Sequence, residues 1–268
     1  MTNMKKLLQK WNAKCLLCML PSLAGTAVFF VAPYLRVLYY SLIDNQFRRN
    51  FVWFENYAKT LANEYFLLAL RNSMLIIVIC VPALVLLALA ISLGLSFGIR
   101  AVRKTRFAFI LPMVIPTASA ALIWQSVFTD TSTPLPVYLL FIWKNIGICI
   151  VLLTAAFTSI DGSIFEAARL DGAGKFTLHT KITIPMIMPT IFFTVLLSIV
   201  NSFKIFKESY LFFGTNYPPD HSYTLQYYMN NNFLKLDYQS LASAAVLTSV
   251  LVFLIVMGGL AVQRRYRQ

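Results

Sequence analysis

The sequence NSMLIIVICVPALVLLALAISLGLSFGI, residues 72–99, is the longest stretch of this chain without Asp, Glu, Lys or Arg. Other long uncharged runs cover residues 15–35, 107–129, 145–160, 182–203 and 238–263. A helix needs ~20 apolar residues to cross the hydrocarbon of a bilayer. The run at 145–160 reaches that length if its helix begins near Pro136 and carries Lys144. The sequence therefore predicts six spans, at about residues 15–40, 70–99, 107–128, 136–158, 182–206 and 239–262.

Composition places the whole chain in one class. Hydrophobic residues make up 59% and charged residues 12%, and mean hydropathy is +0.70, unlike the mix of a soluble domain. Lipid offers no partners to backbone polar groups, and the runs lack the period-2 alternation of barrel strands. We therefore expect an all-α integral membrane protein, with residues 1–268 forming one transmembrane domain.

The distribution of Lys and Arg predicts the orientation, because these residues are retained on the cytoplasmic side. A cytoplasmic N-terminus, with the first apolar run kept as an anchor rather than cleaved as a signal peptide, puts most of the net charge of +13 inside. Both termini and the loop at 159–181 are then cytoplasmic. Nucleic-acid binding is disfavoured, since the positive charge lies at helix ends. The inner basic residues are Lys5, Lys6, Lys10, Lys14, Arg100, Arg103, Lys104, Arg106, Arg169, Lys175, Lys181, Arg264, Arg265 and Arg267.

A search for catalytic and metal sites is negative. His179 and His221 fall on opposite sides of the membrane in this topology, so they cannot share a metal or a catalytic triad. The predicted spans contain no acid, which disfavours a carboxylate proton relay. Gly174-Lys175 is followed by Phe176 instead of Ser or Thr, so the chain has no visible phosphate loop.

The loop between the fourth and fifth spans is unusually well specified. Ser163 and Glu166 have the spacing of a capping box, and Asp161 is another possible N-cap. Gly172-Ala173-Gly174 favours a turn, and a second helix then leads to a kink at Pro185. These cues predict a short helix-turn-helix at the membrane surface. They fit either a solvated loop or a surface that binds a partner.

Three elements of this loop carry a family resemblance: Glu166-Ala167-Ala168, then Asp171-Gly172-Ala173, then Ile184-Pro185. Their spacing closely resembles the EAA signature of permease subunits of binding-protein-dependent ABC importers. The likeness extends over nearly all six spans and is greatest to the sugar branch, the maltose and glycerol-phosphate permease type. Because the ending QRRYRQ lacks the small-residue tail of the second permease, the chain is most similar to the first, maltose-F-like subunit. Further matching residues are Pro33, Arg71-Asn72-Ser73, Leu111-Pro112, Trp124, Trp143-Lys144 and Asn201-Ser202-Phe203.

The resemblance implies a transport subunit and not an enzyme, located in the bacterial plasma (inner) membrane. Its implied partners are a second permease, two ATPase subunits and an extracytoplasmic binding protein that delivers a carbohydrate. No cofactor is expected in this chain, and ATP and Mg would bind the partner ATPase. The loop would dock on that ATPase and rotate the fifth span. The implied coupling residues are Glu166, Ala167, Ala168, Arg169, Asp171, Gly172 and Gly174.

The resemblance also implies a solute pathway lined by Phe141, Lys144, Asn145, Leu197, Asn201 and Phe206. Amides and Lys suit sugar hydroxyls, and an aromatic face suits a sugar ring. Other roles remain open: Lys144 snorkelling to the interface, Asn201 bonding between helices, and the aromatics serving as packing. The connection at 129–136 is shorter than in the family, Asp161 replaces a usual proline, and YLFFGTNYPPD replaces a glycine-rich motif.

Two other classes of membrane protein compete with the importer subunit. A self-sufficient secondary transporter or channel would show inverted repeats or intramembrane acids, and neither is evident. A membrane enzyme would need clustered His or carboxylates at one depth.

Overall fold

The computed structural model describes residues 18–96 and 106–265 of the 268 in the chain. The predicted N-terminal anchor therefore begins outside the described residues. Several predicted cytoplasmic charges also lie outside them, namely Lys5, Lys6, Lys10, Lys14, Arg100, Arg103, Lys104 and Arg267. The described part is almost entirely helical, and its only β interaction is one antiparallel bridge between Ile43 and Phe51. The predicted all-α class is confirmed.

Backbone contacts group the described residues into two units. One contains the described chain up to Leu61 together with Asn232–Leu247, and the other contains Ala62–Asn231 together with the end from Thr248. Two helices cross the boundary, α14 (Leu225–Leu234) and α15 (Tyr238–Arg265).

The first unit begins with a long helix, and side-chain hydrogen bonds hold its segments together. Its helical elements are η1 (Ala27–Val31), α2 (Ala32–Ser41) and α3 (Glu55–Leu61). Asn56 donates to the carbonyls of Ser41 and Ile43 at 3.0 and 2.8 Å. The hydroxyls of Thr60 and Ser243 lie 2.6 Å apart and are buried. These bonds satisfy the polar groups where the chain leaves the first apolar helix.

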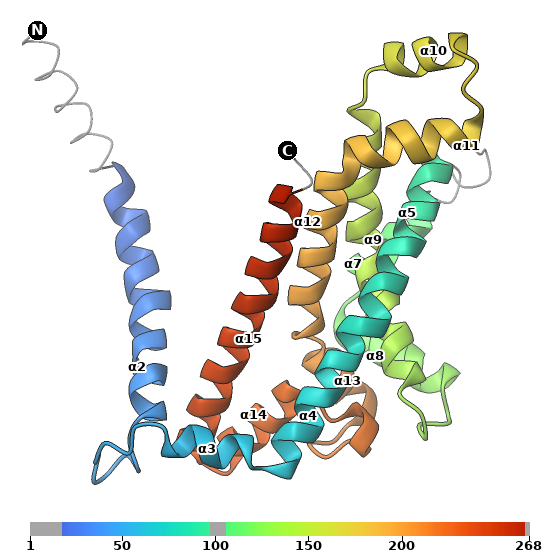
Figure 1. Cartoon of the computed structure of the whole chain (residues 1–268). Coiled ribbons are helices and arrows are strands. Elements are labelled where there is room, and N and C mark those ends of the chain that lie inside the picture. The colour runs from blue at the N-terminus through green and yellow to red at the C-terminus, as the bar shows by residue number, and fades with distance from the viewer. Residues whose placement is uncertain (1–17, 97–105, 266–268) are drawn as a thin grey trace, which may run out of the picture. The chain divides into compact units, whose positions relative to one another are not determined.

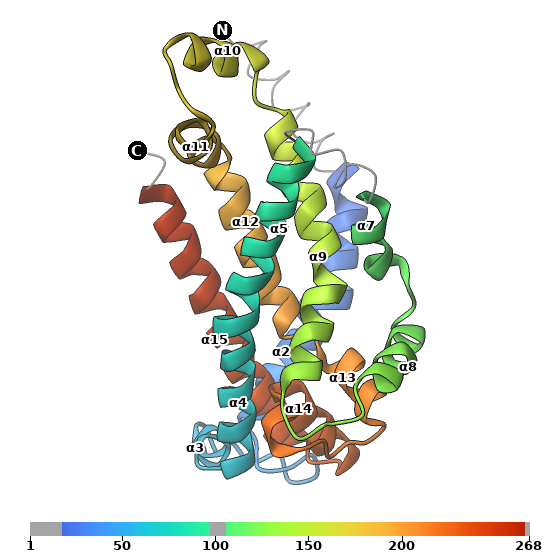
Figure 2. The same cartoon turned by 90° about the vertical axis from the view of Figure 1, so that its right-hand side faces the viewer.

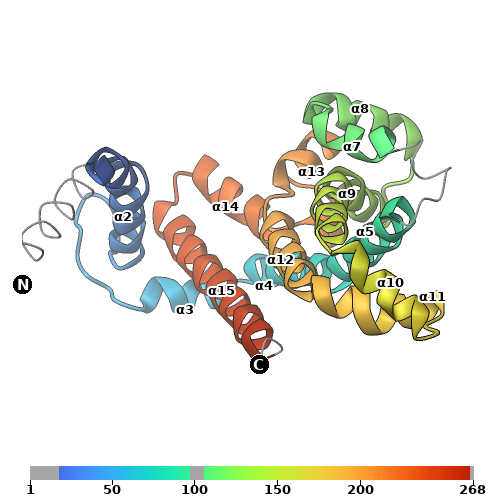
Figure 3. The ribbon, with the colours of Figure 1, turned by 90° about the horizontal axis from the view of Figure 1, so that it is seen from above.

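The second unit contains the remaining elements. In chain order they are α4 (Glu64–Leu75), η2 (Ile76–Cys80), α5 (Val81–Ser96), α7 (Arg106–Val114), α8 (Thr117–Val127), α9 (Leu135–Thr158), α10 (Gly162–Leu170), α11 (Lys175–Thr177), η3 (Leu178–Thr183), α12 (Ile184–Ser202), α13 (Phe206–Phe213) and η4 (Asp220–Ser222). Figures 1 and 2 show α5, α9 and α12 side by side, with α10 beyond one end of them and α13 near the other. Seen from above, α7 and α8 lie beyond α9 (Figure 3).

The core of this unit is apolar with a few small polar residues. Leu84 and Ala88 of α5 and Leu153 of α9 are fully buried. The Ser92 hydroxyl donates to the Ile150 carbonyl at 3.3 Å. Gly147 lets α7 approach α9, since a Cβ there would lie 2.8 Å from the Phe109 carbonyl oxygen. A larger residue at 147 would push the two helices apart.

Among the described residues, five helices are long and apolar enough to span a bilayer: Cys18–Ser41, Glu64–Ser96, Leu135–Thr158, Leu178–Ser202 and Tyr238–Arg264. A sixth candidate is the pair Ala108–Val114 and Thr117–Val127, which is bent by 116°. The sequence predicted one continuous helix over 107–128, and the structure differs here because Pro116 supplies no N–H and disfavours helical backbone at Ile115. Large exposed apolar side chains such as Phe29, Val114 and Leu122 suit a lipid or protein environment.

Candidate functional site

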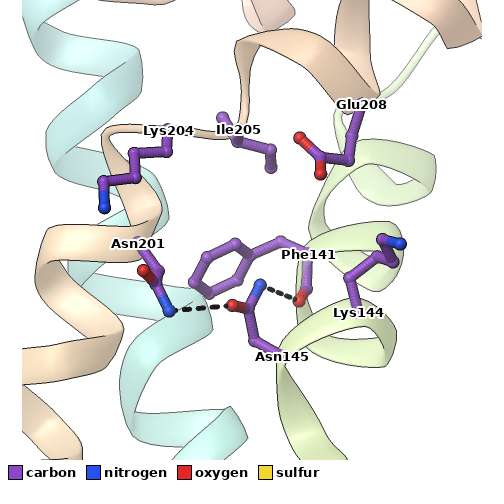
Figure 4. A pocket seen from close by; sticks show the side chains of 7 residues that line it. All are labelled: Phe141, Lys144, Asn145, Asn201, Lys204, Ile205 and Glu208. Atoms are coloured by element: carbon purple, nitrogen blue, oxygen red, sulfur yellow. Dashed lines mark hydrogen bonds between the residues drawn. The ribbon is translucent and has the colours of Figure 1, made fainter. Parts of the chain in front are cut away.

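A cavity of about 220 Å³ lies where α9 meets the segment that joins α12 to α13. It is drawn in Figure 4. Its lining residues come from α9 and from the consecutive turns at the end of α12 and the start of α13. They are Phe141, Lys144, Asn145, Asn201, Lys204, Ile205 and Glu208. The lining thus combines two amides, three ionisable groups and two apolar side chains.

The two amides form a hydrogen-bonded chain across the helices. Asn201 Nδ2 donates to Asn145 Oδ1 at 3.1 Å, and Asn145 Nδ2 donates to the Phe141 carbonyl at 2.9 Å (Figure 4). Each amide has further hydrogen-bonding capacity, because an amide group carries two donor hydrogens and an acceptor oxygen. The pair therefore links α9 to α12 and can still bind a polar ligand.

Lys144 reaches out of the cavity to a broken helix. Its Nζ donates at 2.7 Å to the carbonyl of Ile115, between α7 and α8. That carbonyl follows the end of α7 and precedes Pro116, so no helical N–H is available to it. A cation is also favourable at a helix C-terminus. The bond explains how a lysine is accommodated within the candidate span Leu135–Thr158.

Glu208 is the acid of the cavity. Figure 4 shows its carboxylate directed toward the space that Asn145 and Phe141 also face. Burial raises the pKa of this carboxyl above its ordinary value, while its own backbone N–H and the charges of Lys144 and Lys207 act in the opposite direction. Among the described residues, Lys59–Glu55 is the one salt bridge, so Glu208 has no close ion-pair partner there.

Four of the six residues predicted for the solute pathway line this cavity: Phe141, Lys144, Asn145 and Asn201. Leu197 and Phe206 do not. The Phe206 ring packs instead against Tyr227 and Tyr210, with centroids 4.9 and 5.5 Å away. Phe141 is only 1% exposed, so its ring is mainly part of the core.

Sequence reasoning missed Lys204, Ile205 and Glu208. The family resemblance did not imply them, and Glu208 lies beyond the predicted span at 182–206; the turn at 203–205 and the short helix α13 (Phe206–Phe213) bring all three to the cavity. The helical spacing of Asn201, Ile205 and Glu208 is no signal for this site, because α12 ends at Ser202 and α13 begins at Phe206.

The second candidate site is α10, whose ends are both well capped. Asp161 accepts from the Ser163 N–H at 2.9 Å, and this hydrogen bond lowers the pKa of the Asp161 carboxyl. At the other end Gly172 has φ +79°, and the N–H of Ala173 bonds the Ala168 carbonyl at 2.9 Å. This is a Schellman ending, which glycine favours. Of the two predicted N-caps, Asp161 fills the role, and Ser163 lies within the helix.

The predicted coupling residues form an exposed surface on α10 and its following turn. Glu166, Ala167, Arg169, Asp171, Gly172 and Gly174 are exposed, whereas Ala168 is 9% exposed and faces inward. Leu170 and Phe176 are 89% and 80% exposed. An exposed surface that combines apolar and charged side chains, on a helix capped at both ends, can bind a protein. The chain then continues without interruption through α11, η3 and α12 to Ser202.

The matching residues Asn72 and Ser73 have a positioning role. Asn72 Nδ2 donates to the Asp220 carbonyl and, at 2.8 Å, to the Tyr223 carbonyl. Ser73 Oγ accepts from the Leu225 N–H at 3.1 Å. Trp124 donates to the Pro136 carbonyl at 2.9 Å and stacks on Trp143. These bonds fasten the connections at one end of the second unit.

Comparison with known proteins identifies the family. The family model described as "Binding-protein-dependent transport system inner membrane component" matches residues 72–268. The chain therefore belongs to this family of inner membrane components, and it is a permease subunit of an ABC importer and not an enzyme.

Individual relatives are similar over most of their length. The "Lactose transport system permease protein LacF" of Rhizobium radiobacter is 27% identical, covering 88% of each chain. The "sn-glycerol-3-phosphate transport system permease protein UgpA" of Pectobacterium atrosepticum is 27% identical, covering 92% of this chain and 91% of the relative. The "Osmoprotective compounds uptake permease protein GgtC" of Synechocystis sp. is 27% identical, covering 73% of this chain and 80% of the relative.

Solved structures share the fold. A chain of a bacterial ABC transporter involved in the import of the acidic polysaccharide alginate has a TM-score of 0.75 and 20% identity, with 99% of both chains covered.

Proposed function

We propose that this chain is one of two permeases of an ATP-driven carbohydrate importer, and that it binds the solute in the cavity beside Asn145 and Asn201. An extracytoplasmic binding protein delivers the solute to the assembled pathway. A pair of ATPase subunits, which bind ATP and Mg, receives α10. Both termini and α10 face the cytoplasm. The permease relatives for lactose and glycerol phosphate support a solute of this chemical range.

The observation that carries the proposal is the continuous helix between the two candidate sites. Residues Lys175–Ser202 follow the α10 turn directly and are helical throughout, and Asn201 lies at the far end. Figures 1 and 2 show that this helix bends, so that its part next to α11 lies at an angle to the part of α12 that runs beside α5 and α9. A displacement of α10 by an ATPase would pass through this bent helix to the amide pair and could drive the alternating-access movement of importers.

The cavity size also supports a second permease. Pockets for small molecules usually enclose roughly 300–1,000 Å³, more than the 220 Å³ found here. A second subunit would complete the enclosure of an oligosaccharide.

Substitution of Glu166 by Lys tests the proposal. The variant reverses the charge of an exposed residue on α10, and loss of a charged interfacial contact costs about 2–5 kcal/mol. We expect the assembled importer in proteoliposomes to lose most ATP-dependent uptake while the variant inserts normally. Glu55→Lys, an equal charge reversal in the first unit, should retain uptake. Normal uptake with Glu166→Lys would contradict the docking role of α10.

A further inference from the structure

Resting on the proposed function, we infer that the cavity takes an uncharged, hydroxyl-rich part of the solute and that Glu208 is a solute-binding residue. The class assigned is a neutral sugar or polyol, as opposed to a phosphate or a uronic acid. Three features of the cavity support this assignment: a carboxylate with open acceptor positions, a lysine already bound to backbone, and two amides with unused capacity.

The Glu208 carboxyl needs hydrogen-bond donors. A carboxylate has about four acceptor positions. Among the described residues, no side-chain hydrogen bond or salt bridge to Glu208 is formed. Burial without such bonds disfavours the charged form of Glu208, and this raises the pKa of its carboxyl. Hydroxyl groups of a solute would supply the missing donors.

The two lysines of the cavity are poorly placed to hold an anion. A phosphate or carboxylate is normally held by a free Lys or Arg, but Lys144 directs its ammonium to the Ile115 carbonyl at 2.7 Å. Figure 4 shows this ammonium turned away from Asn145 and Asn201. The other lining cation, Lys204, is exposed, so water weakens its attraction. An anionic group entering here would also be repelled by the carboxylate of Glu208.

The remaining lining suits the alternating surface of a sugar. Asn201 and Asn145 offer amide donors and acceptors, while Ile205 and Phe141 form the apolar part of the lining. Ile205 and Phe141 are 3% and 1% exposed and so are held firmly by the core. The amides of Asn201 and Asn145 would reject a solute that lacks the matching hydroxyl groups, because the amides would then be left buried and unpaired.

Equilibrium binding of radiolabelled probes to the purified, complete importer tests the inference without ATP. The neutral probes are lactose, maltose and N,N′-diacetylchitobiose, and the anionic probes are sn-glycerol 3-phosphate and a uronic-acid disaccharide. We expect at least one neutral probe to bind and neither anionic probe to bind at the same concentration. Glu208→Gln keeps the shape of the side chain and removes its charge. The variant should bind the neutral probe with an affinity about 10-fold lower or more, since hydrogen bonds to charged groups are stronger than those to neutral groups. Glu55→Gln is the matched control and should bind like the native chain.

Three results would overturn the inference: tighter binding of an anionic probe, no binding of any neutral probe, or unchanged affinity with Glu208→Gln. Failure of the proposed function would be distinguished by ATP-dependent uptake. A complex that binds the neutral probe through Glu208 but accumulates none of it with ATP contradicts the importer role and leaves the assignment of Glu208 intact.

Discussion

The α10 loop and the cavity are built in opposite ways. Every feature that ends α10 lies within the segment Asp161–Ala173, so neighbours in sequence are neighbours in space. The cavity joins Phe141 and Asn145 to Asn201 and Glu208 across three elements. Local hydrogen bonds make the first site a stable docking surface, whereas the geometry of the second depends on how helices pack. A change in packing should therefore alter solute binding more than docking, and a change in the caps should do the reverse.

The largest effect should come from the amide pair. Asn145→Ala with Asn201→Ala removes both polar groups and the bond between α9 and α12, each change costing roughly 1–1.5 kcal/mol. We expect kcat/KM for uptake to fall about 30-fold or more. A double-mutant cycle should show coupling between the two sites, because they share one hydrogen bond. Unchanged uptake kinetics would remove the cavity from the solute pathway.

Loss of Lys144 should disturb the broken helix. Lys144→Met keeps the length of the side chain and leaves the Ile115 carbonyl without its donor, which costs about 1–3 kcal/mol if no water replaces it. We expect a lower Tm of the purified complex and altered fluorescence of the stacked Trp124 and Trp143. The control is Lys204→Met, a change at an exposed lysine of the same cavity. Equal Tm values for the two variants would contradict the bond to Ile115.

A smaller effect is expected at the turn after α10. Gly172→Ala places a Cβ on backbone with φ +79°, at a cost of about 1–2 kcal/mol. ATP-dependent uptake should fall several-fold, with solute binding unchanged. Gly174→Ala is the matched control, because the added Cβ meets open space and the backbone φ is not in the left-handed region. A similar loss in both variants would indicate that turn geometry is not the cause.

The smallest effect is expected at the N-cap. Asp161→Ala removes the acceptor for the Ser163 N–H, whereas Asp161→Asn keeps one. Hydrogen exchange at residues 163–166 should become faster in the Ala variant and stay near native in the Asn variant. The pKa of Asp161 is lowered in the folded chain, so the ionised cap contributes stability above the ordinary Asp pKa and loses it only as pH falls through the lowered value. Exchange at neutral pH should therefore report the intact cap.

The contrast between the sites also explains what could be predicted. Apart from the bent segment at 107–128, the spans and the α10 turn follow from apolar run length and from cap residues, both of which are local properties. Asn145 and Asn201 were named because the family resemblance implies them as pathway residues, and both line the cavity. Glu208 was not found, since its role depends on the turn of the chain at Ile205 into α13. The binding of Lys144 to Ile115 depends on the break at Pro116, and both lie far from Lys144 in sequence.

The most direct test of the account is a photocrosslink from the exposed position of Ala167 on α10. A benzophenone amino acid at this position, in the assembled importer, should form an adduct with the ATPase subunit. The same group at Phe47, which is 97% exposed in the first unit, should form none with that subunit. Absence of the ATPase adduct from position 167 in a complex that transports normally would contradict the claim that α10 receives the ATPase.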